Sequence, residues 1–129
     1  MSFLNKIFSS DKTPQEPKKE IPWKPLTSVS EVDEIVKTSK TKPVAIFKHS
    51  TSCGISRMVL KQFERDYDIE EGTMGLYYLD LLSYRNVSNE VAARFQVMHQ
   101  SPQLLVIKNG AAVYNASHHS IQAAELEKL

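Results

Sequence analysis

The chain has 129 residues, of which 16 are Lys or Arg and 15 are Asp or Glu, so its net charge is +1. This length suits one domain with a hydrophobic core of its own, and the near-zero charge gives no reason to expect a nucleic-acid or membrane partner. The single cysteine, Cys53, excludes an intramolecular disulfide and any multi-cysteine metal site built by one chain. A lone thiol also suits a reducing compartment. We therefore expect a cytoplasmic protein that binds no metal through ligands of its own.

Residues 9–25 are polar, charged and rich in proline, a composition that cannot bury enough surface to fold by itself. We predict a flexible N-terminal tail over residues 1–25 and one domain over 26–129. The apolar residues between Phe3 and Phe8 are too few for a signal sequence or a membrane span. Trp23 is the residue that could dock the tail onto the domain.

From residue 26 onward, helical and extended patterns alternate. Ser28 and Glu31 form a capping-box pattern that predicts a helix to about Lys37. Pro43 then starts an apolar run that indicates a buried strand. After Cys53 the apolar residues follow helical spacing, a second strand is expected over 75–82, and Asn86 or Ser88 is expected to cap the next helix. The apolar positions of the helix after Cys53 are Ile55, Met58, Val59, Phe63 and Tyr67.

The C-terminal part predicts a strand over 103–108, a hairpin turn at Asn109-Gly110, a returning strand over 111–116 and a helix over 121–129. Two strands joined through a helix form a parallel pair with a right-handed crossover, and the hairpin adds an antiparallel strand. The expected fold class is therefore α/β, with a mixed four-stranded sheet and helices on both faces. Ligands of such sheets gather beyond the carboxyl ends of the parallel strands, where Cys53 lies.

Cys53 is the candidate catalytic residue because it stands at the predicted start of a helix. Unpaired N–H groups and the helix dipole favour a thiolate there, and the sulfur could accept from the N–H groups of Ile55 and Ser56. The Ser56 hydroxyl could donate a further hydrogen bond, while Gly54 leaves room for a partner disulfide. The alternative is a buried, inert cysteine, but polar neighbours before Cys53 favour exposure.

Other residues near Cys53 are candidates for substrate binding. Ser52, Lys48 and His49 lie within a few residues of the sulfur, although a cation in such a place is more often an ordinary solvated side chain. His49 could also act as a base. His118 and His119 are better interpreted as surface or helix-cap residues than as metal ligands, since no partner ligand has suitable spacing.

Ser101-Pro102 immediately precedes the strand over 103–108, where proline is tolerated. In the predicted topology this turn lies beside the start of the cysteine helix. A cis bond there would expose the Ser101 backbone N–H and C=O to an extended peptide or a thiol ligand. We include Ser101 and Pro102 among the predicted substrate-binding residues.

A strand, a cysteine at a helix start and a proline before a hairpin strand together resemble the thioredoxin-like arrangement. Within it, residues 26–121 resemble the monothiol bacilliredoxins, the bacillithiol system proteins of the YtxJ type, through FKHSTSCGIS, SPQLLVIKNG and VYNASHHSI. The resemblance implies a cytoplasmic enzyme that removes bacillithiol from S-bacillithiolated client proteins. It makes Cys53 the nucleophile, the Ser101-Pro102 turn the substrate-facing loop and bacillithiol the cosubstrate, with no bound cofactor.

The tetrapeptide Cys53-Gly-Ile-Ser56 keeps a second function open. Gly54 stands where the bacilliredoxins often have Pro or Ser, and the motif is similar to the Cys-Gly-Phe-Ser of monothiol glutaredoxins, which bind an iron–sulfur cluster between two subunits with glutathione. Those proteins grip glutathione with a Gly-Gly-x-Asp turn, whereas this chain has Asn-Ala-Ser-His-His at 115–119. A third possibility is a non-enzymatic adaptor with a thioredoxin-like fold.

Overall fold

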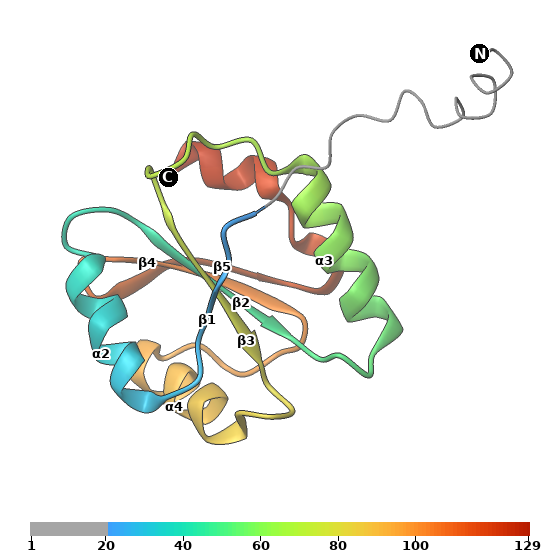
Figure 1. The fold of residues 1–129 in the computed structure, drawn as a ribbon, viewed down its shortest axis with the longest axis horizontal. Coiled ribbons are helices and arrows are strands. Elements are labelled where there is room, and N and C mark those ends of the chain that lie inside the picture. The colour runs from blue at the N-terminus through green and yellow to red at the C-terminus, as the bar shows by residue number, and fades with distance from the viewer. Residues whose placement is uncertain (1–20) are drawn as a thin grey trace, which may run out of the picture.

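The computed structural model describes residues 21–129 of the chain, which form one mixed sheet with helices on both faces (Figure 1). In the sheet, the strand order is β1-β3-β2-β4-β5. Strands β1, β3 and β2 are parallel to one another. Strand β4 pairs antiparallel with β2, and β5 pairs antiparallel with β4. The elements are β1 (Lys24–Pro25), α2 (Val29–Thr38), β2 (Val44–His49), α3 (Gly54–Asp66), β3 (Gly75–Asp80), α4 (Arg85–Phe95), β4 (Gln103–Lys108), β5 (Ala111–Ser117) and the short 3₁₀ helices η2 (His118–Ser120) and η3 (Ala123–Lys128).

The predicted α/β architecture is confirmed, but the predicted four-stranded sheet is wrong by one strand. Lys24 and Pro25 pair in parallel with Tyr77 and Tyr78, so the sheet of the described residues has five strands. Lys24 and Pro25, which the sequence assigned to the tail, therefore form a strand of the sheet. The rest of the predicted tail, residues 1–20, lies outside the described residues.

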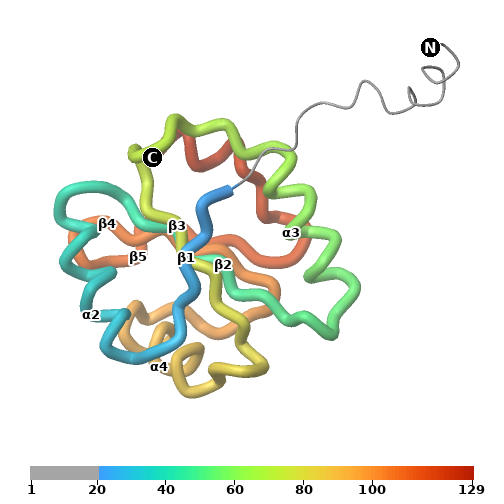
Figure 2. The backbone as a smooth tube through the Cα atoms, viewed as in Figure 1, coloured from blue at the N-terminus to red at the C-terminus, as the bar shows by residue number. Residues whose placement is uncertain are grey.

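Alternation along the strands produces two separate cores, because successive side chains point to opposite faces of a sheet. Val44 and Ile46 of β2 face α2 and α4, whereas Ala45 and Phe47 face α3 and the C-terminal segments. The tube view shows the two helical layers on either side of the strands (Figure 2). The described part of the protein thus has two packed layers that share one sheet.

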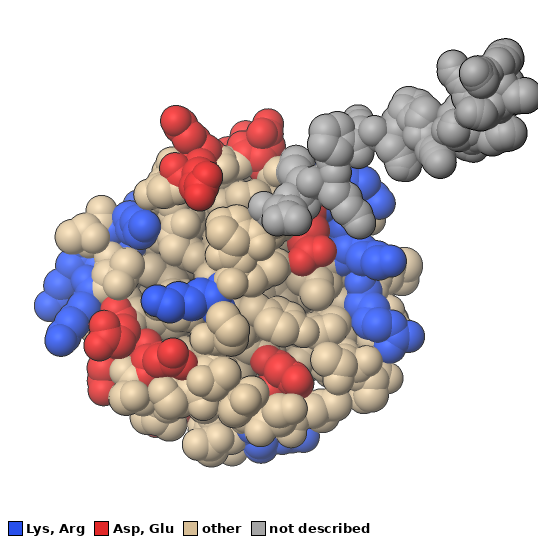
Figure 3. Space-filling model, viewed as in Figure 1, with Lys and Arg blue, Asp and Glu red and all other residues tan. Residues whose placement is uncertain are grey.

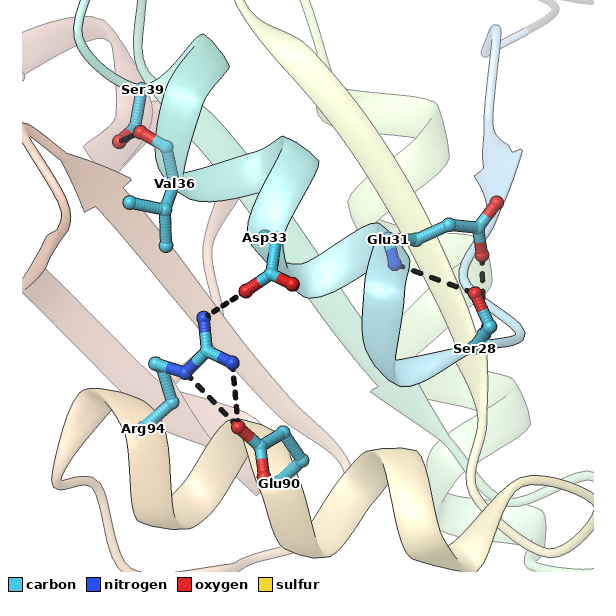
Figure 4. A network of polar contacts seen from close by, with 7 residues as sticks. All are labelled: Ser28, Glu31, Asp33, Val36, Ser39, Glu90 and Arg94. Carbon is cyan, nitrogen blue, oxygen red and sulfur yellow. Dashed lines mark hydrogen bonds and ion pairs between the residues drawn. The ribbon is translucent and has the colours of Figure 1, made fainter.

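The capping box at the start of α2 is confirmed, since Ser28 accepts from the Glu31 N–H and Glu31 accepts from the Ser28 N–H. Further along, Arg94 of α4 lies 2.9 Å from Asp33 of α2 and 2.8 Å from Glu90 of its own helix (Figure 4). These ion pairs are accessible to solvent and contribute little stability. The pair of Arg94 with Asp33 links the two helices that cover this face.

Two of the predicted helices differ from the structure. Helix α4 starts at Arg85 with Tyr84 as its N-cap, so neither Asn86 nor Ser88 caps it. Ser88 is buried, and its hydroxyl faces His99 at 3.4 Å instead of the helix end. The predicted helix over 121–129 is the 3₁₀ helix η3, in which the buried residues Ala123 and Leu126 are three positions apart, the period of that helix.

Among residues 21–129, none of the helices is both long enough and apolar enough to cross a membrane.

Trp23 anchors the N-terminal strand to the α3 face of the sheet. Its ring centroid lies 6.0 Å from Phe47, 5.8 Å from Phe63 and 6.2 Å from Tyr78. The indole N–H donates to a Glu64 carboxylate oxygen of α3 at 2.7 Å. A partly exposed tryptophan thus joins β1 to the helix that follows Cys53.

Replacing Trp23 with Ala should lower the free energy of unfolding by about 2 kcal/mol, less than the loss of a fully buried tryptophan, because the ring is only partly buried. Trp23→Phe should lose less, because it keeps part of the aromatic contacts and gives up the rest together with the hydrogen bond to Glu64. Urea unfolding followed by circular dichroism measures both changes. Equal stability of wild type and Trp23→Ala would contradict the anchoring role.

Candidate active site

Cys53 lies at the carboxyl end of β2, as the topology predicted. It is the N-cap of α3, with an extended backbone at φ −108° and ψ 123°. Its N–H donates to the Ser50 carbonyl at 3.1 Å, and its own carbonyl accepts from the Arg57 N–H at 3.1 Å. Cys53 is in no disulfide and is partly exposed as a residue.

The predicted hydrogen bonds to the Cys53 sulfur are not formed in the described structure. As the N-cap, Cys53 makes no side-chain hydrogen bond to the first turn of α3, so the sulfur does not accept from the N–H groups of Ile55 and Ser56. The Ser56 hydroxyl is fully buried and has other partners. It lies 2.8 Å from His49 Nδ1 and accepts from the Ser50 N–H at 3.1 Å. Ser56 therefore fixes the loop on which Cys53 stands instead of touching the sulfur.

His49 lies beneath this loop, on the same face of β2 as Phe47. Its side chain is 4% exposed, and its ring centroid is 5.5 Å from that of Tyr78. Burial lowers the pKa of His49, which Asp80 raises again in part, and a lowered pKa favours the neutral imidazole. A neutral ring can accept a hydrogen bond from the Ser56 hydroxyl at Nδ1. The structure therefore joins His49 to Ser56, away from the surface predicted for substrate binding.

The exposed rim around Cys53 combines apolar and basic side chains. Ile55 is 45% exposed and Met58 is 54% exposed. Arg57 reaches back across the loop, where it donates to the Thr51 carbonyl at 3.0 Å. A methyl group added to Gly54 would be 3.8 Å from the Arg57 guanidinium, an ordinary contact, so this position accepts a side chain.

Basic side chains gather where α3 borders the molecule (Figure 3). Arg57, Lys61 and Arg65 are all exposed and lie four residues apart on this helix, so they share one side of it. Ser52 is also exposed, and its hydroxyl lies 3.4 Å from that of Ser50. The helix that begins after Cys53 therefore carries a row of exposed basic side chains that starts at Arg57.

The Ser101-Pro102 turn lies at the same end of the sheet as Cys53. Gln103 of β4 pairs with Lys48 of β2, so Pro102 lies beside the end of β2. The Ser101-Pro102 bond is cis, and the Pro102 carbonyl accepts from the His118 N–H at 3.0 Å. The Ser101 hydroxyl is shielded from solvent and has no hydrogen-bond partner in the described structure.

Lys48 points away from Cys53, toward α4. Its side chain is fully buried, and its ammonium group lies 3.4 Å from the Ser88 carbonyl and 3.3 Å from His99 Nδ1. Burial lowers the pKa of Lys48 to about 8. Lys48 is thus not part of the surface around Cys53, and no sequence pattern singled out His99 as its partner.

His118 and His119 are exposed, as predicted. Within residues 21–129, no three His, Cys, Asp or Glu side chains come together as a metal site would require.

Comparison with known families fits this geometry. The family model described as "Monothiol bacilliredoxin BrxC" matches residues 24–126. The chain belongs to the monothiol bacilliredoxin family. The match covers Cys53, the loop before it and the Ser101-Pro102 turn, and it makes this bacilliredoxin a thiol oxidoreductase with one cysteine.

Solved structures similar to this bacilliredoxin have the thioredoxin fold. A candidate oxidoreductase with a thioredoxin fold is 31% identical, with a TM-score of 0.68 over 81% of this chain and 89% of the other. A thioredoxin of Malassezia sympodialis is 20% identical, with a TM-score of 0.65 over 89% and 93%. Thioredoxin f of spinach chloroplasts is 16% identical, with a TM-score of 0.61 over 88% and 94%. The last two show the fold alone.

Replacing Lys48 with Met should stabilise this bacilliredoxin at pH 7 by about 1–3 kcal/mol, because a buried charge without an ionic partner is removed. The folded pKa of about 8 lies below the ordinary value of 10.5, so the unfolded chain binds more protons between these values. The free energy of unfolding of the wild type therefore rises relative to that of Lys48→Met above pH 8. The difference in stability between the two proteins becomes smaller. Urea unfolding at pH 7 to 9.5 measures it.

The exposed Lys40 provides the control, since Lys40→Met should show no such dependence on pH. A gap between wild type and Lys48→Met that stays constant from pH 7 to 9.5 would contradict the buried charge.

Proposed function

We propose that the chain is a monothiol disulfide reductase that removes bacillithiol, or a similar low-molecular-weight thiol, from mixed disulfides on cytoplasmic proteins. The main support is the single accessible thiol at the start of α3 in a chain of the bacilliredoxin family. The residue three positions on is Ser56, which is buried and hydrogen-bonded to His49. A second thiol that could close a disulfide with Cys53 is therefore replaced by a structural hydroxyl.

The reaction that fits this site is one thiol–disulfide exchange followed by an external reset. The Cys53 thiolate attacks the bacillithiol sulfur of the mixed disulfide, a bond forms between these two sulfurs, and the client cysteine leaves as a thiolate that takes a proton from water. The enzyme then carries bacillithiol on Cys53. An external thiol or a reductase attacks that disulfide and restores the free Cys53.

The surroundings of Cys53 suit a protein client that carries a small anionic thiol. Ile55 and Met58 are exposed apolar side chains of α3, the helix that begins directly after Cys53, and a client protein could pack against them. Arg57 crosses the loop next to Gly54 with part of its guanidinium free of the bond to Thr51. Carboxylates of a small thiol could bind there by charge-assisted hydrogen bonds.

The specificity of Cys53 can be determined by intact-mass measurement after exposure to bacillithiol disulfide or, separately, to glutathione disulfide. We expect one bacillithiol adduct on the wild type, much less glutathione adduct, and none of either on Cys53→Ser. Equal adducts from both disulfides would contradict the preference for bacillithiol. No adduct from either would contradict the proposed exchange.

Two further measurements separate the two other functions that the sequence left open. A carrier that holds an iron–sulfur cluster between two Cys53 thiolates should gain visible absorbance on reconstitution with iron and sulfide, and Cys53→Ser should abolish it. An adaptor should keep its partner when Cys53 is replaced with Ser. The family match favours exchange over both.

Replacing Ser56 with Cys should convert the enzyme into a dithiol. The new thiol lies one helical turn from Cys53 and should displace bacillithiol from it, giving an intramolecular disulfide with two hydrogen atoms fewer than the reduced protein. Loss of the hydrogen bonds to His49 and Ser50 should also lower stability by about 1–3 kcal/mol. Intact mass after adduct formation measures the conversion.

Thr41→Cys is the matched control, because Thr41 is exposed in the turn before β2, at the opposite end of that strand from Cys53. It should keep the adduct on Cys53. An equally long-lived adduct on Ser56→Cys would show that the residue at this position does not set the monothiol chemistry.

A further inference from the structure

The row of side chains on the α4 face of β2 and β4 ends in a buried polar pair. Register partners on these two strands lie directly opposite each other and share one face of the sheet. Two such pairs are apolar and belong to the core between the sheet and the helices α2 and α4. The third pair is polar, although its side chains are 0% and 1% exposed. The three pairs are Val44–Ile107, Ile46–Leu105 and Lys48–Gln103.

Both members of the polar pair bind the segment that leads into the Ser101-Pro102 turn. The Gln103 amide donates to the Met98 carbonyl at 3.0 Å and accepts from the Gln100 N–H at 3.4 Å. The Lys48 ammonium lies 3.3 Å from His99 Nδ1, between these two points. Three consecutive residues before Ser101 are therefore tied to the ends of β2 and β4.

Ser88 of α4 completes this cluster. Its carbonyl lies 3.4 Å from the Lys48 ammonium, and its hydroxyl lies 3.4 Å from His99 Nδ1. The segment 98–100, in which Met98 and His99 are exposed, thus lies against the end of the sheet and the first turn of α4. One buried cation joins the strand that leads to Cys53 with the loop that leads to Pro102.

Burial of the Lys48 ammonium group lowers the stability of the fold, and an apolar side chain would fill this position without that cost. Lys48 forms no ion pair with any carboxylate of residues 21–129, and its partners are a carbonyl and an imidazole. Burial of an ammonium group with only neutral partners is unfavourable, whereas the other β2 residues of this row, Val44 and Ile46, are apolar. A costly polar group at the edge of a candidate site indicates a functional constraint.

We propose that Lys48 and His99 are positioning residues, which hold segment 98–100 against the sheet and so set the Ser101-Pro102 turn beside Cys53 for binding of the client chain. The proposal rests on the disulfide-reductase function above and gives Lys48 a role without contact to substrate. His99 Nδ1 accepts a hydrogen bond from the Lys48 ammonium group, and an asparagine at position 99 could offer an amide oxygen in a similar place. A leucine could not.

The test combines hydrogen exchange of the peptide over 96–102 with kinetics on an S-bacillithiolated client protein. In Lys48→Met and in His99→Leu, the hydrogen-exchange rate of the Gln100 amide should be about tenfold higher than in wild type, because the segment opens locally. The KM for the client should rise about tenfold, with kcat within about twofold. His99→Asn should restore values near wild type, and Lys40→Met, at an exposed lysine, should match wild type.

The melting temperature separates positioning from a merely structural role. Lys48→Met should melt at or above the wild-type temperature while its KM rises, whereas a fall in melting temperature together with KM and kcat would overturn the proposal. An unchanged hydrogen-exchange rate of the Gln100 amide in Lys48→Met would also overturn it. If Cys53→Ser still released bacillithiol from the client, the proposed function would fail, yet the exchange data would still report on the cluster by themselves.

Discussion

The hydrogen bond between the Ser56 hydroxyl and His49 Nδ1, 2.8 Å long and fully buried, joins the first turn of α3 to the end of β2. The position of Cys53 depends on it, because the loop over 50–53 spans these two elements and its Ser50 N–H donates to the same hydroxyl. The aromatic cluster of Trp23, Phe47 and Phe63 packs behind this point and fixes α3 against the sheet. The thiol is thus presented on a rigid frame, although its sulfur makes no capping hydrogen bond.

The site draws on both layers of the protein. Cys53 and His49 belong to the layer between the sheet and α3, whereas the segment before Pro102 is held from the opposite layer by Lys48 and His99. The two meet only at the end of the sheet, where β2 stops and β4 begins. Neighbouring residues of one strand, Lys48 and His49, thus have partners on opposite faces of the sheet.

A monothiol enzyme needs a residue at position 56 that cannot form a disulfide but still supports the loop. Serine meets both needs, since its hydroxyl donates and accepts in a fully buried position. Gly54, in contrast, has no steric reason to be glycine, because an added methyl group would make only an ordinary contact. The likeness of Cys-Gly-Ile-Ser to the glutaredoxin motif therefore lies in a position that the backbone leaves open.

The sequence by itself determined the order of the main elements, the Ser28–Glu31 capping box, the turn at Asn109-Gly110 and the place of Cys53 at a helix start, because these follow from local periodicity and turn chemistry. It could not show that Lys48 faces α4, that Ser56 bonds to His49, or that residues 24 and 25 add a strand. Only the tertiary structure decided these, because they depend on sheet register and on partners far apart in the sequence, such as Lys24 with Tyr77 and Lys48 with Gln103. Local sequence patterns do not determine such pairings, because the pairings form only when distant segments pack together.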